Sequence, residues 1–180
     1  MLRKLFHFSG IVIPLTYFLT DKKSALFLAA GVLVLDIILE TMRIKGHFKL
    51  AFIERNMKES EDKRLSGTFF YMLSSLATIA FFEKTVALSV LCILCTADPL
   101  SSLAGTKFGR VRLLGKSLEG TVTFFVVSFF ILRLFAFATP AALAGATVAC
   151  LTELFSSRII DDNLSIPLVT ALALTLLTRF

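Results

Sequence analysis

The sequence predicts an all-α, polytopic integral membrane protein with about seven transmembrane helices and a cytoplasmic N-terminus. Apolar residues make up 56% of the 180 residues, and the mean hydropathy is +0.83. Only 18% of the residues are charged, whereas a soluble domain carries about a quarter. The apolar residues also form blocks that approach the ~20 residues needed to span a bilayer, separated by short polar stretches.

Seven apolar blocks follow one another along the chain. They cover about 5–20, 24–41, 68–82, 85–106, 119–137, 138–156 and 164–178. The longest polar segment, at about 43–67, is expected to be a charged cytoplasmic loop, and it is too short to form a core of its own. We therefore expect residues 1–180 to form a single transmembrane domain.

The basic residues predict the orientation. With seven helices, the N-terminus and the second, fourth and sixth loops share one side, which holds 14 of the 19 Lys and Arg residues. The positive-inside rule places that side in the cytoplasm. Part of the net charge of +6 is therefore topological, and without an aromatic-basic module it does not indicate nucleic-acid binding.

Charged residues are costly inside a bilayer, so acidic residues within apolar blocks are functional hypotheses. Four of them lie in the cytoplasmic halves of their expected helices: Asp36, Glu40, Asp98 and Glu153. Glu40 can form a helix-end ion pair with Arg43. Glu153 can pair with Arg158 or His7, so its role stays open between structure and function.

Asp98 is the most informative of the four because it directly precedes Pro99. Proline frees a backbone carbonyl, which a membrane tolerates where the helix lines a cavity or is covered by protein. The i, i+3, i+4, i+7 pattern of one helix face is followed by Asp98, Ser101, Ser102 and Gly105, and Gly109 continues it. We favour a polar cleft open to the cytoplasm. Gly105 and Gly109 also fit a small-residue packing face, which leaves the carboxylate unexplained.

A basic, glycine-punctuated loop follows. It contains Lys107, Gly109, Arg110, Arg112, Gly115, Lys116, Ser117, Glu119 and Gly120. Gly115-Lys116-Ser117 resembles the end of a P-loop, but the first glycine of that motif would be residue 110, which is Arg. Basic residues beside flexible backbone at a helix start instead predict an anion site. Ser117 can also cap that helix, and Glu119 can offset its dipole.

The last polar cluster lies before the seventh block and contains Arg158, Asp161, Asp162, Asn163, Ser165 and Pro167. Adjacent carboxylates with an amide oxygen suit Mg²⁺ shared with phosphate oxygens. The alternative is helix capping by Asn163 or Ser165, with Pro167 in the first turn. Since capping needs only one of these residues, we favour a metal or phosphate site.

These motifs together resemble the CTP-dependent lipid-alcohol kinases, which include dolichol kinases, phytol kinases and the CTP-dependent diacylglycerol kinase. The matching segments are Asp98-x₆-Gly105-x₃-Gly109-Arg110, Lys116-Ser117-x-Glu119-Gly120-Thr121 and Asp162-Asn163-x₃-Pro167. The likeness extends to Arg3-Lys4-x-x-His7, to Glu40 with Arg43, and to Ser66-Gly67-Thr68. It covers nearly the whole chain.

The resemblance implies transfer of the γ-phosphoryl group of CTP to the hydroxyl of a polyprenol, a phytol-like isoprenoid or diacylglycerol. It implies that Lys116 and Arg110 hold phosphates, that Asp162 with Asp161 binds Mg²⁺ or another divalent cation, and that Asp98 is a metal ligand or accepts the alcohol proton. The rest of the nucleotide site would be Gly105, Gly109, Ser117, Glu119 and Gly120. Supporting roles would fall to His7, Asp36, Glu40, Arg43, Glu153, Arg158 and Asn163. We expect a prokaryotic cytoplasmic membrane protein whose active site faces the cytoplasm and whose partners are the lipid and CTP.

Two other functions compete with this one. The segment 98–120 also resembles phosphatidate cytidylyltransferases, which make CDP-lipids, but their Lys-Asp and Gly-His-Gly-Gly signature is absent from 157–167. A small transporter would place its substrate site near the bilayer midplane, often between repeated halves. The sequence has neither a repeat nor polar groups that continue to the outer face.

Overall fold

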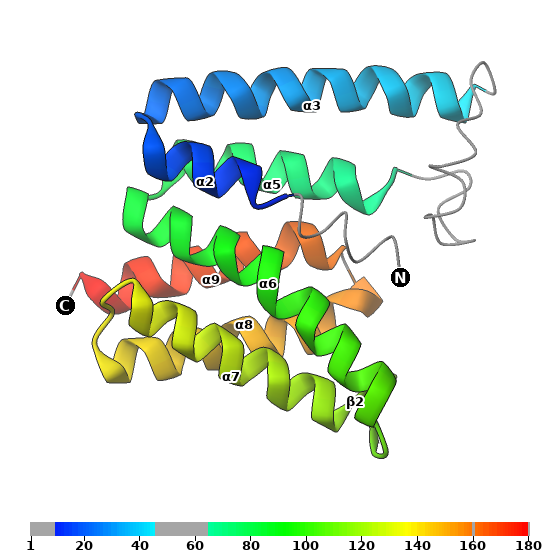
Figure 1. The fold of residues 1–180 in the computed structure, drawn as a ribbon, viewed down its shortest axis with the longest axis vertical. Helices are drawn as coiled ribbons and strands as arrows, with labels where there is room; N and C mark the ends of the chain where they lie inside the picture. The colour runs from blue at the N-terminus through cyan, green and yellow to red at the C-terminus, as the bar shows by residue number, and fades with distance from the viewer. Residues whose placement is uncertain (1–9, 46–64, 160, 180) are drawn as a thin grey trace.

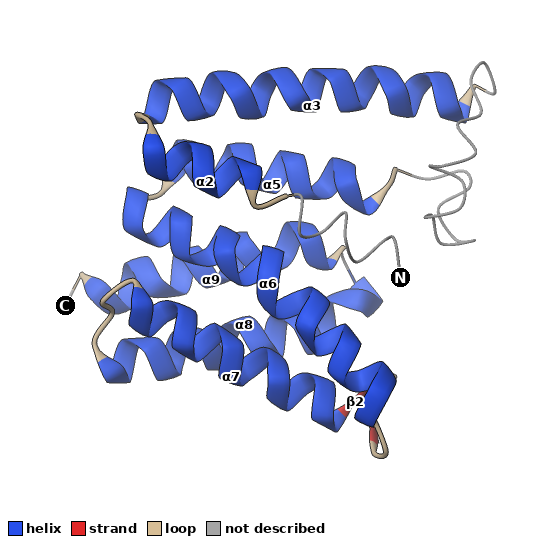
Figure 2. Cartoon of the chain, viewed as in Figure 1, coloured by secondary structure: helices blue, strands red, loops and turns tan. Residues whose placement is uncertain are grey.

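The computed structural model describes residues 10–45, 65–159 and 161–179 (Figures 1 and 2). Its helices are α2 (Val12–Leu19), α3 (Lys22–Ile44), α5 (Gly67–Phe81), α6 (Lys84–Phe108), α7 (Leu118–Leu134), α8 (Thr139–Ile159) and α9 (Asp162–Thr178). Two short strands, β1 (Arg112–Leu113) and β2 (Lys116–Ser117), form a hairpin between α6 and α7. The helices match the seven expected blocks in order, which confirms the all-α prediction for the described residues.

The helix ends differ from the expected ones at several places. Helix α3 continues to Ile44, so Arg43 belongs to the helix and not to the charged loop. The remainder of that loop, 46–64, lies outside the described residues. Helix α7 ends at Leu134 instead of 137, because Ala136 adopts a left-handed conformation with φ 61°. The hydrogen bonds from Phe137 N to Leu132 O (3.2 Å) and from Ala136 N to Arg133 O (3.1 Å) complete a Schellman motif there.

Successive helices run in alternating directions (Figure 1). The connections α2–α3, α5–α6 and α7–α8 lie together at one end of the bundle, at the left of the figure. The end of α3, the start of α5, the β1–β2 hairpin and the start of α9 all lie toward the other end, at the right of the figure. We call this second end the basic end, because its described residues include Lys45, Lys107, Arg110, Arg112 and Lys116. The arrangement agrees with the prediction that the second, fourth and sixth loops share a side.

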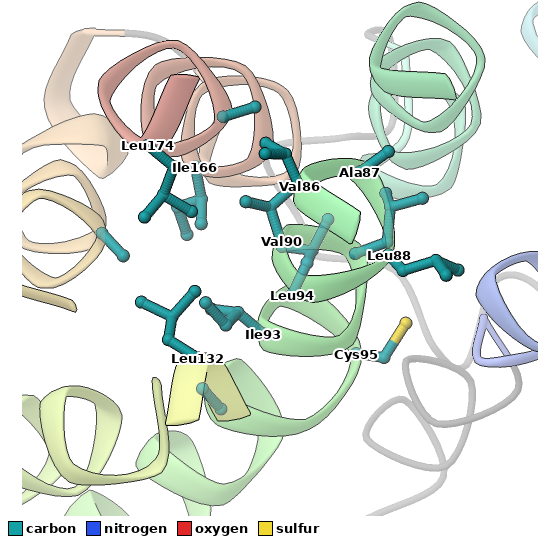
Figure 3. Packing of buried hydrophobic residues seen from close by; sticks show 14 of the residues in the cluster. Val86, Ala87, Leu88, Val90, Ile93, Leu94, Cys95, Leu132, Ile166 and Leu174 are labelled. Carbon is teal, nitrogen blue, oxygen red and sulfur yellow. The ribbon is translucent and has the colours of Figure 1, made fainter. Parts of the chain in front are cut away.

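The core forms around α6 and α9. Helix α6 packs against α2, α5, α7 and α9, and α9 packs against α5, α6 and α8. In Figure 3, Val90 points toward Ile166 and Leu174 of α9, and Ile93 points toward Leu132 of α7. Helix α6 is thus covered by several neighbours, and most of its buried residues lie in its first half.

The outer faces of the helices are as apolar as the inner ones. Buried residues of α7 recur every four positions, at Gly120, Phe124, Ser128 and Leu132. An exposed stripe with the same spacing consists of Leu118, Val122, Val126, Phe130 and Leu134, which are 41–83% exposed. A helix at a water-exposed surface carries polar residues on its outer face. The stripe therefore suits an apolar surrounding.

Two described helices, over Lys22–Met42 and Lys84–Phe108, are long and apolar enough to cross a membrane. Shorter apolar helices cover Gly67–Phe81 and Asp162–Thr178. Only 22% of the first span is buried, against 67% of the second. Helix α3 consequently lies at the edge of the bundle, with most of its apolar surface directed outward.

Polar contacts fix the end opposite the basic end. The Lys84 ammonium group donates hydrogen bonds to the carbonyls of Phe18 (3.3 Å) and Thr20 (2.8 Å), where α2 ends. Asp21 Oδ1 accepts a hydrogen bond from Ser24 N (2.8 Å) at the start of α3. Hydrogen bonds from Ser24 lower the pKa of the exposed Asp21 carboxyl. These two charged residues therefore act as helix caps.

Candidate active site at the basic end

Three carboxylates from different helices come together near the basic end. Glu153 of α8 interacts electrostatically with Asp98 of α6 and with Asp162 of α9. Asp98 and Asp162 are half-buried, and Glu153 is only 4% exposed. The three residues lie far apart in the sequence, and the packing of α6 and α8 on α9 brings Asp98 and Asp162 within electrostatic range of Glu153, so we refer to the three as the carboxylate cluster.

Lys116 brings a positive charge to this cluster. Its Nζ donates hydrogen bonds to Glu153 Oε1 (2.5 Å) and to the Glu153 carbonyl oxygen (2.6 Å). The other carboxylate oxygen, Glu153 Oε2, is buried and has no hydrogen-bond partner among the described residues. Arg158 and His7, the expected partners of Glu153, have no described side chains. Lys116 is the partner that the sequence did not predict.

Lys116 is held by a hairpin and not by the flexible loop that was expected. Residue Arg112 pairs with Ser117, and Leu113 pairs with Lys116. The two turn residues, Leu114 (φ 52°) and Gly115 (φ 94°), both have the positive φ of a type I′ turn. The expectation of a loop was wrong because the sequence has Leu where such a turn favours Asn, Asp or Gly.

The hairpin is fastened to α7 at both ends. Leu118 N donates to Val111 O (2.9 Å), and Arg110 N donates to Glu119 Oε1 (2.9 Å). Glu119 lies in the first turn of α7, before the apolar part of that helix begins. The Glu119 carboxylate thus fixes the backbone of the loop that carries the exposed Arg110 side chain.

The predicted glycines bring α6 and α7 together. A Cβ atom on Gly120 would lie 2.8 Å from the Ser101 carbonyl oxygen, and one on Gly109 would lie 2.8 Å from Ser117 Cβ. A Cβ atom on Gly105 would collide with Ser117 Oγ. The packing interpretation of Gly105 and Gly109 is therefore confirmed, Gly120 packs closely as well, and the contribution of all three glycines to nucleotide binding stays a prediction.

Ser101 and Ser117 make local hydrogen bonds on the polar face of α6 and at the start of α7. Ser101 is buried and donates to the Asp98 carbonyl (2.8 Å), whereas Ser102 is exposed. Ser117 Oγ accepts a hydrogen bond from Gly120 N (3.1 Å), which confirms Ser117 as the cap of α7. The polar cleft beside Asp98 stays a prediction.

The start of α9 was predicted incorrectly. Asp161, not Asn163 or Ser165, caps the helix, and its Oδ1 accepts from Asn163 N and Asn163 Nδ2 (both 2.9 Å). Asn163 Nδ2 also lies 3.4 Å from Asp162 Oδ1. Since α9 begins at Asp162, Pro167 falls in the second turn and not in the first. The buried Asn163 thus holds one oxygen of each aspartate.

The other expected supporting residues belong to a helix that carries none of the cluster residues, or their side chains are not described. Asp36 and the buried Glu40 belong to α3, which packs on α5 and α2. The side chains of Arg43 and Arg158 are not described, and His7 lies outside the described residues. Within the described ranges, no three His, Cys, Asp or Glu side chains form a group that could hold a metal ion by themselves.

The contacts that α5 makes near this region were not predicted from the sequence. The Tyr71 hydroxyl, buried in α5, donates to the Gly10 carbonyl (2.7 Å) and lies 3.1 Å from Cys95 Sγ, one turn before Asp98. A Cβ atom on Gly67 would lie 2.9 Å from Asn163 Nδ2. Gly67 belonged to a recognised motif, Ser66-Gly67-Thr68, but no sequence pattern marked Tyr71.

The chain is similar in sequence to an uncharacterized protein and to kinases of lipid alcohols. An uncharacterized protein of Rickettsia prowazekii is 31% identical over 97% of this chain and 92% of its own length. The chloroplastic farnesol kinase of Arabidopsis thaliana is 28% identical over 96% of this chain, and the dolichol kinase of Saccharomyces cerevisiae is 27% identical over 92%. No family model matches the chain. No solved structure matches it either.

The two kinases are longer than this chain. The alignment spans 64% of the farnesol kinase and 34% of the dolichol kinase. Nearly the whole of this chain is nevertheless covered in each comparison, including the segments that carry Asp98, Lys116 and Asp162 in the cluster. The chain belongs to the same family as the Rickettsia protein, and lipid-alcohol kinases are its distant homologues.

Proposed function

We propose that the protein is a membrane-embedded kinase that transfers the γ-phosphoryl group of CTP to the hydroxyl of a lipid alcohol. The observation that carries the proposal is the ion pair of Lys116 with the buried Glu153, a carboxylate within electrostatic range of Asp98 and Asp162, at the basic end of an otherwise apolar bundle. Homology to farnesol and dolichol kinases supports the reaction class. The acceptor would be a polyprenol, a phytol-like isoprenoid alcohol or diacylglycerol.

Phosphoryl transfer needs positioned groups and charge stabilisation more than covalent chemistry. In the proposed reaction the alcohol oxygen forms a bond to the γ-phosphorus, the bond from that phosphorus to the β–γ bridging oxygen breaks, and CDP leaves. The hydroxyl proton passes to a carboxylate, for which we propose Asp98. Lys116 and Arg110 would hold the phosphate groups, since Lys116 lies at Glu153 and Arg110 is exposed on the adjoining loop.

The carboxylates also fit a divalent cation that arrives with the nucleotide. Mg²⁺ is commonly bound by one or two carboxylates together with substrate phosphates and water. Asp98 and Asp162, with Asp161 beside them, would hold Mg²⁺, and the ion would neutralise charge on the phosphates.

The membrane setting is part of the proposal. The outward stripe of α7 and the apolar outer surface of α3 support a lipid surrounding for all seven helices. A lipid alcohol keeps its tail in the bilayer and its hydroxyl at the interface, where the basic end would meet it. The positive-inside rule would direct that end to the cytoplasm, where CTP is present.

One experiment tests donor and reaction together. Membranes that contain the protein are supplied with Mg²⁺, a lipid alcohol and CTP labelled at either the γ- or the α-phosphate, and the lipids are extracted. Label from the γ-phosphate alone is the expected result. Lipid label from the α-phosphate would support a CDP-lipid synthase, and no lipid label from either would refute both enzymes and leave transport. γ-Labelled ATP in a parallel reaction tests the choice of nucleotide.

The role of Asp98 has its own test. Asp98→Asn should lower γ-phosphoryl transfer at least ~100-fold, the lower range for general acid–base catalysis, because the amide neither accepts the proton nor binds Mg²⁺ well. Asp21→Asn is the matched control, since asparagine preserves the helix cap at the opposite end of the bundle. Near-normal turnover in Asp98→Asn, with normal amounts of folded protein in the membrane, would refute this assignment.

A further inference from the structure

Glu153 binds Lys116 through two of its own atoms. The Lys116 ammonium group has three N–H donors, and two of them are directed at Glu153, one at Oε1 and one at the backbone carbonyl. We propose that Glu153 is a positioning residue that fixes Lys116 for its phosphate ligand and leaves the third N–H for that phosphate. This inference rests on the proposed kinase function and assigns Glu153 a defined part in it.

The Lys116 side chain is anchored at both of its ends. Its backbone belongs to β2, which pairs with β1 and continues directly into α7. Its ammonium group is held by α8, with a side-chain exposure of 22% for Lys116 and 6% for Glu153. A free lysine loses much rotamer freedom when it binds a ligand, and a lysine that is already fixed loses less.

The position given to Lys116 is chemically useful. Glu153 interacts electrostatically with both Asp98 and Asp162, so the ammonium group is held at a carboxylate that lies within electrostatic range of the two aspartates that the proposed reaction uses. The positive charge also reduces repulsion among the three carboxylates. Stability alone explains the pair poorly, since a buried ion pair is often no more stabilising than well-packed apolar residues.

Glu153→Asp is the sharpest variant for this role. It preserves the charge and withdraws the carboxylate by one methylene, so it changes the position of Lys116 and not the electrostatic balance. Immobilising one flexible side chain corresponds to roughly a 3- to 10-fold change in affinity. Glu153→Asp should therefore raise KM for CTP about 3- to 10-fold in the γ-phosphoryl transfer assay. Thr152→Val, at the preceding position of α8, is the control that should leave KM unchanged.

A double-mutant cycle separates positioning from other roles. If Glu153 acts through Lys116, Glu153→Asp will have no further effect on KM in a Lys116→Met background. An unchanged KM in the single variant, or an equal rise in both backgrounds, would overturn the proposal. If Glu153 is purely structural, Glu153→Asp will lower Vmax and the melting temperature in detergent while KM for CTP stays constant. Glu153→Gln repeats the cycle if the aspartate variant does not fold.

The positioning role of Glu153 can be tested even if the proposed kinase function fails. If the wild-type protein transfers no γ-phosphoryl group to lipid, the kinase proposal fails. The same cycle is then measured as the Kd of Mg²⁺–CTP for the purified protein in detergent. Coupling in that binding constant would support the positioning role by itself, and independent effects of the two substitutions would refute it.

Discussion

Replacement of Gly120 by alanine probes the close approach of α6 and α7. The new Cβ atom would lie 2.8 Å from the Ser101 carbonyl oxygen and 2.9 Å from Ser117 Oγ. The first contact is with backbone inside α6, which cannot move without shifting the helix. The second is with the hydroxyl that caps α7 through Gly120 N.

The size of the effect follows from three contributions. Alanine favours a helix interior over glycine by about 1 kcal/mol. Overpacking costs about 1–3 kcal/mol, and loss of a serine cap costs about 1 kcal/mol. The net destabilisation of Gly120→Ala is therefore about 1–3 kcal/mol, which for a chain of this size lowers the melting temperature by roughly 3–10 °C.

The control for this prediction is Gly31→Ala in the middle of α3, where no atom lies within 4 Å of the added Cβ atom. That variant should gain helix propensity and raise the melting temperature by roughly 2–4 °C. Both are measured by thermal unfolding of the purified protein in the same detergent. Equal melting temperatures for the two variants would refute the backbone-to-backbone packing of α6 and α7.

Three further substitutions test local structure by the same measurement. Ala136→Gly should stabilise the protein by about 1 kcal/mol, because glycine adopts the left-handed conformation after α7 without strain; a lower melting temperature would contradict the Schellman motif. Leu114→Asn should also stabilise it, by about 0.5–1 kcal/mol, because asparagine is favoured in a type I′ turn, and slower proteolysis of the hairpin would accompany the gain. Ser66→Ala should cost about 1 kcal/mol by removing the cap on Phe69 N (3.3 Å), whereas Ser66→Asp should not.

The helices were predictable because the apolar blocks are long and the polar stretches between them are short. Each of the seven described helices falls on an expected block, although the ends differ by several residues. Those differences have local causes, such as the left-handed Ala136, which no residue preference indicates. The hairpin was missed for a similar reason, because Leu114 has a positive φ, which leucine seldom adopts.

The candidate site was predictable in its residues but not in its pairings. Asp98 was singled out because a carboxylate inside an apolar block needs an explanation, and Lys116 because of its motif. The contact between Lys116 and Glu153 depends on how α8 packs beside the hairpin, and periodicity along one helix carries no information about that. The capping of α9 by Asp161 was missed because Asp161, Asn163 and Ser165 are all good capping residues.

Because the helices alternate in direction, the partial charges of their ends contribute little to the electric field at the basic end. Helices α5, α7 and α9 begin there, and α3, α6 and α8 end there. Each helix end carries about half an elementary charge, positive at the start and negative at the end, so these partial charges largely cancel. The local potential is therefore set by whole charges on side chains. Adding or removing one carboxylate or ammonium group would therefore change the electrostatic attraction of this end for an anion. The salt dependence of the nucleotide affinity would change with it.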